Sequence, residues 1–406
     1  MYSTYKLKNG FSLVYEKMPF VKTVSVGIWV RAGSMYESKK ENGISHFIEH
    51  MLFKGTKRRS AYKIAEEMDF VGGHMNAYTS RECTCYYAKT LSESLELSVD
   101  MLSDMYYNSL FAEEDIEVER KVIIEEINMY EDSPEDVSID GLTEYIWENN
   151  PLGYQIAGSI ETVSKITREM MLDYMHRRYT PENTVISVAG SFDEKELIAL
   201  CEKYFSGGEN VFSEPLSPPQ FIPCRKVREK DIEQTHLSIA YPAFKLCDDG
   251  VYEITLLNNI LGASMSSRLF QSVREKYGLC YSIYSYTASY PQAGMIGIYA
   301  GLNSGEAEKA EKLIQEETDR LSSEKISSYE LEKARSQIRC SLIMNRESVS
   351  SKMSENGKAM LLLGRVRSEE ETLERINGIS REDLLQCAKK VFTPENKAVF
   401  ILKNQR

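Results

Sequence analysis

Two histidines and a glutamate lie within five consecutive residues of the chain: His46, Glu49 and His50. On a helix, residues i and i+4 stack on one face, and residue i+3 lies beside them. Two imidazoles placed in this way can bind Zn²⁺, and the neighbouring carboxylate can take a proton from an attacking water. A five-residue H-x-x-E-H match is a modest signal by itself, because short motifs arise by chance. The segment is therefore a candidate zinc site that needs a further ligand.

A catalytic zinc site has three protein ligands and keeps a fourth position open. The stretch 113–130 is strongly acidic and has apolar residues at helical spacing. It offers Glu119 and Glu126, which are seven residues apart and so lie on nearly the same face of a helix. Apolar Val122, Ile123 and Ile127 are interspersed with them, which argues against a purely solvated face. Acidic helices are mostly solvated, however, so the pattern alone leaves the ligand role of Glu126 open.

The elements around these residues have recognisable patterns. We expect a strand over 23–31, a helix that begins near Asn42 and ends at Gly55, and a second helix over Ala61–Phe70. A strand rich in Thr, Tyr and Cys follows over 74–90. Within that strand Cys83 and Cys85 point to one side, but no further ligands follow at finger-like spacing, so we expect them to be buried packing residues.

The chain contains an internal repeat. Residues 161–183 align without gaps to 374–396, at an offset of 213, and nine positions are identical, including the closing Thr-Pro-Glu-Asn. A stretch rich in Pro, Gly and Ser separates the two halves. We therefore expect an α+β fold with two homologous domains, each a mostly antiparallel sheet flanked by helices. The expected boundaries are 1–208 for an N-terminal zinc-binding domain, 209–224 for a linker, and 225–406 for a C-terminal domain without metal.

Composition excludes several classes of function. The chain has 406 residues, of which 42% are hydrophobic and 27% charged, with a net charge of −12, so we expect an ordinary globular protein that does not bind nucleic acid. No apolar run is long enough to span a membrane, and the first residues lack the apolar block of a signal peptide. Eight scattered cysteines do not suggest a disulfide scaffold. We therefore expect a cytoplasmic protein that does not associate with membranes.

Longer motifs resemble one family. GISHFIEHMLFKGTKRRS, GGHMNAYTSRECTCYYAKT and ERKVIIEEINMYEDSP resemble, in this order, the active-site helix, the following strand and the third-ligand helix of the pitrilysin family of zinc metallopeptidases. The likeness is to its small-subunit branch, with the β subunit of mitochondrial processing peptidase and bacterial relatives, so we expect a bacterial source. H-x-x-E-H is the inverzincin order. The resemblance implies one Zn²⁺ per chain, bound by His46, His50 and Glu126, with Glu49 as general base and Glu119 supporting the site.

The resemblance also implies where substrate binds. Asn76, Ala77, Tyr78 and Thr79 match the edge strand to which family members add a peptide as an extra strand. Arg274 and Tyr281, seven residues apart, match a pair that reaches the active site from the partner domain and steadies the developing oxyanion. No H-x-x-E-H occurs in the second half, where the offset of 213 places residues 259–263 opposite the motif. One half is thus expected to keep the metal chemistry and the other to keep the Arg/Tyr pair.

Two domains are half of a pitrilysin-type clamshell, so the resemblance implies a dimer around an inner cavity. Because this chain carries both the zinc motif and the Arg/Tyr pair, we expect a homodimer. The expected substrates are unfolded peptides, and the acidic balance of the chain favours basic ones. Two alternatives stay open: a non-catalytic structural homologue, such as those found in respiratory complexes, and a peptide binder without turnover.

Overall fold

The computed structural model describes residues 2–208 and 216–405. The chain folds into two compact units, and each takes segments from both sides of the expected linker, which lies partly outside the described residues. Unit 1 comprises Met1–Ile127, Tyr154–Leu216 and Ile343–Ser368. Unit 2 comprises Asn128–Gly153, Ser217–Leu342 and Glu369–Arg406.

Six strands form the sheet of unit 1. They are β1 (Tyr2–Lys6), β2 (Ser12–Lys17), β3 (Thr23–Val30), β4 (His74–Thr79), β5 (Thr84–Leu91) and β6 (Thr184–Gly190). Their order in space is β1-β2-β6-β3-β5-β4, and β2 with β6 is the one parallel pair. Strand β4 therefore lies at an edge of the sheet.

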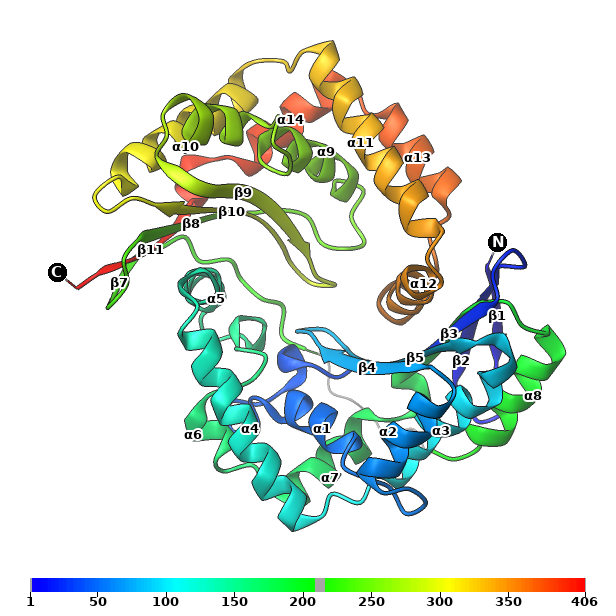
Figure 1. Cartoon of the computed structure of the whole chain (residues 1–406). Coiled ribbons are helices and arrows are strands. Elements are labelled where there is room, and N and C mark those ends of the chain that lie inside the picture. The colour runs from blue at the N-terminus through cyan, green and yellow to red at the C-terminus, as the bar shows by residue number, and fades with distance from the viewer. Residues whose placement is uncertain (1, 209–215, 406) are drawn as a thin grey trace. The chain divides into compact units, whose positions relative to one another are not determined.

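Helices cover both faces of this sheet. The helical segments of unit 1 are α1 (Ile44–Leu52), α2 (Ala61–Phe70), α3 (Leu95–Asn108), most of α4 (Glu113–Glu131), α6 (Ile160–Val163), α7 (Arg168–Arg178), α8 (Glu194–Tyr204) and α12 (Val349–Leu363). In Figure 1, α1, α2 and α3 lie on one face and α12 on the other. The expected helices at Asn42–Gly55 and Ala61–Phe70 are thus present, the first as Ile44–Leu52.

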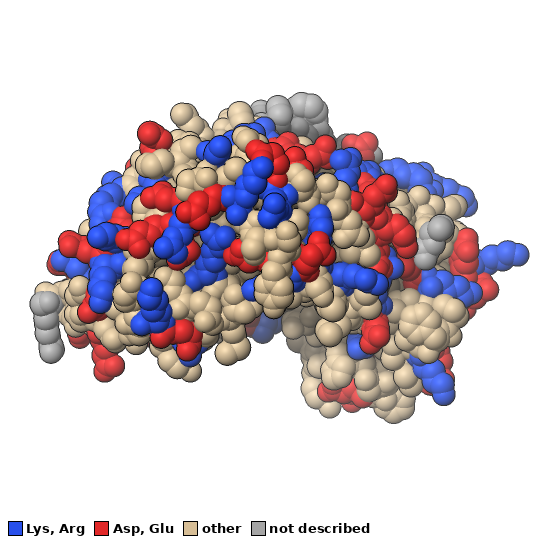
Figure 2. Space-filling model, turned by 90° about the horizontal axis from the view of Figure 1, so that it is seen from above, with Lys and Arg blue, Asp and Glu red and all other residues tan. Residues whose placement is uncertain are grey.

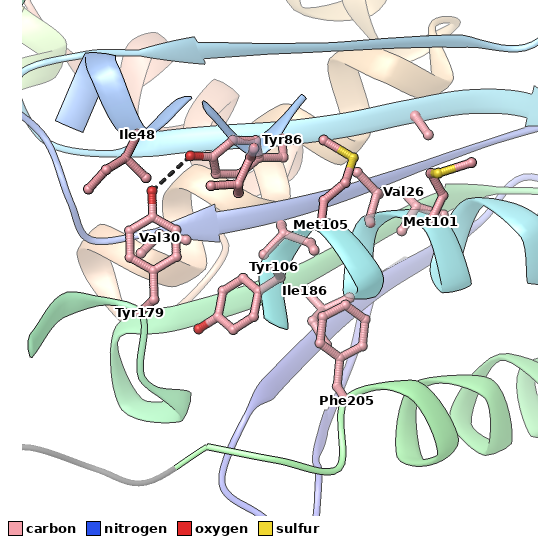
Figure 3. Close-up of a cluster of buried hydrophobic side chains, with 14 of the residues drawn as sticks. Val26, Val30, Ile48, Tyr86, Met101, Met105, Tyr106, Tyr179, Ile186 and Phe205 are labelled. Carbon is pink, nitrogen blue, oxygen red and sulfur yellow. Dashed lines mark hydrogen bonds between the residues drawn. The ribbon is translucent and has the colours of Figure 1, made fainter. Parts of the chain in front are cut away.

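The main core of unit 1 fills the space between the sheet and the α1 and α3 side. Val26 and Val30 of β3 and Ile48 of α1 contribute to it, together with methionines of α3 (Figure 3). Among these apolar groups, the hydroxyls of Tyr86 and Tyr179 hydrogen-bond to each other at 2.8 Å. The face of α1 that carries Ile48 is thus fixed by burial, which orients the opposite face.

Helix α12 covers the other face of the sheet, and this explains a departure from simple alternation in β3. Val24, Val26, Ile28 and Val30 alternate along β3 and share one face, but the intervening residues are buried too. Trp29, fully buried, donates a hydrogen bond from Nε1 to Met353 Sδ of α12 at 3.4 Å. A strand covered on both faces has no polar side to show.

Unit 2 repeats this architecture with five strands. They are β7 (Arg225–Lys230), β8 (Thr235–Pro242), β9 (Cys280–Ser289), β10 (Gly294–Leu302) and β11 (Ala398–Asn404). The order β7-β11-β8-β10-β9 matches β2-β6-β3-β5-β4 strand for strand, and β7 with β11 is again the parallel pair. The two Thr-Pro-Glu-Asn segments form equivalent turns before β6 and β11. The α+β fold with two homologous sheets is confirmed.

The helical segments of unit 2 are α5 (Pro134–Ile146), α9 (Val251–Leu261), a π-helical segment η5 (Phe270–Lys276), α10 (Ala307–Ser323), most of α11 (Ser328–Arg346), α13 (Glu369–Gly378) and α14 (Arg381–Val391). Helix α5 packs on the sheet through Gly141, which contacts Phe400, and through a 2.7 Å hydrogen bond between Ser138 and Ser238. Adding the repeat offset of 213 to the residue numbers of α5 gives the region of α12, so the two helices are equivalent in the two repeats. Helix α5, from the first repeat, packs on the sheet of unit 2, and α12, from the second repeat, packs on the sheet of unit 1. This exchange mixes the two halves of the sequence in both units.

None of the helices in the described ranges has the length and apolar character needed to cross a bilayer. Cys83 and Cys85 are unpaired and fully buried, as packing residues should be.

Candidate metal centre

Helix α1 presents the H-x-x-E-H residues because its other face is buried. Phe47, Ile48 and Met51 are inaccessible to solvent, whereas Glu49 and His50 remain partly accessible. The helix begins after Gly43, whose φ of 96° favours glycine. A Cβ there would lie 2.6 Å from the carbonyl oxygen of Ala157. The start of the helix is therefore fixed by a close approach of two backbone segments.

A buried carboxylate caps this helix. Glu37 accepts hydrogen bonds from the backbone N–H groups of Gly43 at 2.8 Å and Ser45 at 2.9 Å, and from the Asn42 side chain at 3.0 Å. Burial raises the pKa of Glu37, and these donors offset part of that shift. Glu37 thus satisfies N–H groups that the first turn of a helix leaves unpaired.

Replacing Glu37 by glutamine is expected to lower the free energy of unfolding by about 1–3 kcal/mol, because an amide nitrogen would face unpaired N–H donors. Urea denaturation of the zinc-free protein measures this. Glu114→Gln, on the exposed face of α4, is the matched control. Equal midpoints for the two variants would show that the cap contributes nothing.

Three expected ligand atoms converge beside α1. Glu126 Oε2 lies 3.6 Å from His46 Nε2 and 3.5 Å from His50 Nε2, and all three ligand atoms lie within 4.8 Å of one another. Zn–N and Zn–O bonds of about 2.0–2.1 Å at tetrahedral angles separate ligand atoms by about 3.3 Å. The spacing therefore fits a zinc ion bound by two imidazoles and one carboxylate.

The two imidazoles differ in their surroundings. Burial, followed by the nearby His50, lowers the pKa of His46 to about 4, so its ring is neutral near pH 7, as a metal ligand must be. Burial lowers the pKa of His50 as well, but its contacts with Glu126 and Glu119 outweigh burial and raise it. Its Nε2 still faces Glu126, at 3.5 Å.

Glu119 contacts the ring nitrogen of His50 that does not face Glu126. Its Oε2 accepts a hydrogen bond from His50 Nδ1 at 3.0 Å, and its other oxygen pairs with Lys54. Glu119 is only 4% exposed. A carboxylate that binds the second ring nitrogen fixes the orientation and tautomer of a ligating histidine. His46 has no such support, since its Nδ1 is buried without a hydrogen-bond partner in the described part of the chain.

Glu49 lies on the same face and contacts the edge strand. The hydroxyl of Thr79 donates a hydrogen bond to Glu49 Oε2 at 2.5 Å. Burial raises the pKa of Glu49, while Thr79 and His50 act in the opposite direction. A carboxylate whose pKa is raised toward neutrality is better suited to accept a proton.

The expected substrate residues lie on edge strand β4, which pairs with β5 and has its other side free of strands in the described sheet. Accessibility alternates along β4, with Asn76 and Tyr78 exposed and Ala77 and Thr79 half-buried. An unpaired edge of this kind can accept an added strand.

The expected Arg/Tyr pair is found in unit 2. Arg274, on η5, places its guanidinium 5.2 Å from the ring centre of Tyr281, which is the second residue of β9 and is 80% exposed. The two side chains thus lie together and are accessible.

Unit 2 has no room for a side chain at Gly262, the residue that directly follows α9. The sequence offset of 213 places Gly262 opposite Glu49, although α9 begins and ends earlier than this offset predicts from α1. A Cβ at Gly262 would lie 2.5 Å from the backbone nitrogen of Ser285 on β9, so a side chain there is excluded unless the strand moves.

Sequence reasoning missed three contacts: the cap by Glu37, the pairing of Lys54 with Glu119, and the bond from the Thr79 side chain to Glu49. Thr79 was expected to bind substrate, and its position on the strand gave no sign of this second contact. Lys54 could have been found, since it lies just beyond the end of α1, four residues after His50, and basic residues are favoured near the C-terminal ends of helices.

Comparisons with known proteins identify the family and the fold. Residues 12–159 match the family description "Insulinase (Peptidase family M16)", and residues 165–338 match "Peptidase M16 inactive domain". An "uncharacterized zinc protease", YmxG of Bacillus subtilis, is 41% identical over 396 residues, which are 97% of each chain. A protease from Helicobacter pylori has a similar structure, with a TM-score of 0.93, 22% identity and 99% of each chain covered. A chain of Candida albicans complex III is also similar, with a TM-score of 0.87 and 21% identity over 99% of this chain and 95% of that one.

Proposed function

Because the chain belongs to the M16 (insulinase) family of peptidases, within which its curated relatives are named zinc proteases, we propose that it is a zinc-dependent endopeptidase. The observation that carries the proposal is the convergence of His46, His50 and Glu126 within 4.8 Å, with Glu49 on the same helix face. One Zn²⁺ per chain would occupy this position.

Bound zinc would supply a Lewis acid that polarises the scissile carbonyl and makes the attacking water more acidic. The chain's own residues do the rest. Glu49 accepts the proton of the water and delivers it to the leaving amine. Glu119 holds the ring of His50, and Lys54 holds the carboxylate of Glu119.

The substrate would be an unfolded peptide that pairs with β4 along Asn76, Ala77, Tyr78 and Thr79. Backbone pairing at a sheet edge gives affinity with weak demands on side chains. Arg274 and Tyr281 would donate hydrogen bonds to the peptide or to the oxyanion, since both carry donors suited to a developing negative charge.

We further propose a homodimer that encloses peptides in a cavity, with a preference for basic peptides because the net charge is −12. Figure 2 shows acidic and basic side chains intermixed on the face in view, without a large field of one sign. We therefore expect acidic residues of individual elements, such as those of helix α4, to attract basic peptides, and not the surface shown in Figure 2.

A second candidate function is a non-catalytic role, which the likeness to a complex III chain favours. The intact ligand set argues against it, because a subunit that does not bind metal has no need to keep two histidines and a glutamate together.

The test is digestion of a mixture of short unstructured peptides, read by mass spectrometry. Zinc-loaded protein is expected to cleave, chelated protein to be inactive, and added zinc to restore cleavage. If the loaded protein retains zinc and cleaves nothing, the structural or peptide-binding function replaces the peptidase.

A further inference from the structure

The hydrogen bond between Thr79 and Glu49 joins two elements that the proposed reaction uses separately. Thr79 is the last residue of edge strand β4, and Glu49 lies in the last turn of α1. Their side chains meet at 2.5 Å, a short distance typical of a hydroxyl that donates to a carboxylate.

The hydroxyl of Thr79 has two acceptors within reach, and Glu49 is the closer and the charged one. Thr84, opposite Thr79 in the β4–β5 pair, donates its own proton to the carbonyl oxygen of Ala32 at 3.0 Å. Thr84 can therefore only accept from Thr79, at 3.3 Å against 2.5 Å for Glu49 Oε2. Thr84 is fully buried, so its orientation is fixed. Since threonine is also stiff about χ1, the hydroxyl of Thr79 has a defined position from which to donate.

Glu49, in contrast, has a flexible side chain. A glutamate has three rotatable side-chain bonds, and its carboxylate has no preferred direction unless a partner holds it. Its Oε2 accepts the hydrogen bond from Thr79, which gives the carboxylate such a partner.

We propose that Thr79 is a positioning residue that holds the Glu49 carboxylate in the orientation needed for proton transfer, a role that rests on the proposed peptidase function. Its backbone belongs to the edge at which a peptide would add, while its side chain holds the base. Thr79 therefore links peptide pairing along β4 to the alignment of Glu49.

The first test compares Thr79→Val, which keeps the shape but removes the donor, with Thr79→Ser, which keeps the donor. For T79V we expect kcat to fall about 10- to 100-fold, as loss of a hydrogen bond to a charged group predicts, with KM changed less than about twofold. T79S should recover most of the wild-type kcat. Zinc affinity, measured by competition with a chelator, should be the same in all three proteins.

Thr90→Val is the matched control, because it removes another buried threonine hydrogen bond in unit 1, to Ser98 at 3.0 Å on β5 and α3. It should leave kcat unchanged. If T90V and T79V lose activity equally, or if T79S fails to recover it, general destabilisation explains the result and the proposal is wrong.

A second measurement does not depend on activity. High-resolution crystal structures of the zinc-loaded proteins should show one Glu49 rotamer in the wild type and T79S, and two or more in T79V. One unchanged rotamer in T79V would overturn the proposal. If no protein cleaves peptide, the peptidase function fails, and the rotamers still decide whether Thr79 positions Glu49. Thr79→Ala repeats the comparison if T79V does not fold.

Discussion

Replacing Glu49 by glutamine is expected to leave zinc bound and to lower kcat for peptide hydrolysis by about 100- to 10,000-fold, the usual contribution of a general base. The amide cannot accept a proton, whereas the ligand atoms of His46, His50 and Glu126 are unchanged. Glutamine also keeps the size of the side chain and can accept the hydrogen bond from Thr79. The readouts are kcat on a fluorogenic peptide and the zinc content of the purified protein.

Glu125→Gln is the matched control, since Glu125 is an exposed carboxylate next to Glu126 that faces away from the metal centre. It should retain full activity and full zinc. Activity within a few-fold of wild type in E49Q would remove Glu49 from the reaction and leave the peptidase without a base.

Much of the site could be predicted because it is local in sequence. His46, Glu49 and His50 lie on one face of α1 through helical spacing alone, and burial of Ile48 on the opposite face settles which side is presented. Glu126 was placed by its resemblance to a known helix, since its acidic surroundings gave no geometric reason to prefer it. The fold followed from the repeat, whose Thr-Pro-Glu-Asn turns precede equivalent strands.

What could not be predicted depends on contacts between distant segments. Helix α12 covers the sheet of unit 1, and nothing in the pattern of residues 349–363 shows that its partner is Trp29, more than three hundred positions earlier. Burial of the second face of β3 has the same origin, because α12 covers it. Glu37 was missed because a buried carboxylate looks like a surface residue until its N–H donors are known.

The two repeats differ in the space between the edge strand and the helix that packs beside it. In unit 1, the space between α1 and β4 holds Glu49 and its partner Thr79. In unit 2, Gly262 lets the corresponding helix contact β9 directly. A base could not be restored there by substitution alone, since the strand would have to move. The close contact at Gly262 thus distinguishes the packing of the second repeat from that of the first.

Removing the carboxylate ligand should weaken zinc binding far more than removing the carboxylate that supports His50. Substitutions of residues that orient a ligand typically cost about 10- to 100-fold in metal affinity. We expect Glu119→Gln to fall in that range, because the ring of His50 loses its charged partner. Glu126→Gln deletes a ligand and should lose more than about 100-fold, because two imidazoles alone fill only half of a tetrahedral site.

Competition with a zinc-binding dye measures both affinities, and Glu125→Gln, which lies on the same helix, should bind as tightly as the wild type. The expected order of affinity is E125Q, then E119Q, then E126Q. The reverse order for the last two would make Glu119 the ligand, although its Oε2 now contacts the Nδ1 of His50 and its other oxygen contacts Lys54. That result would require Glu119 to exchange both partners for the metal, whereas Glu126 already faces the two Nε2 atoms. The relative zinc affinities of E119Q and E126Q therefore decide which of the two carboxylates binds zinc.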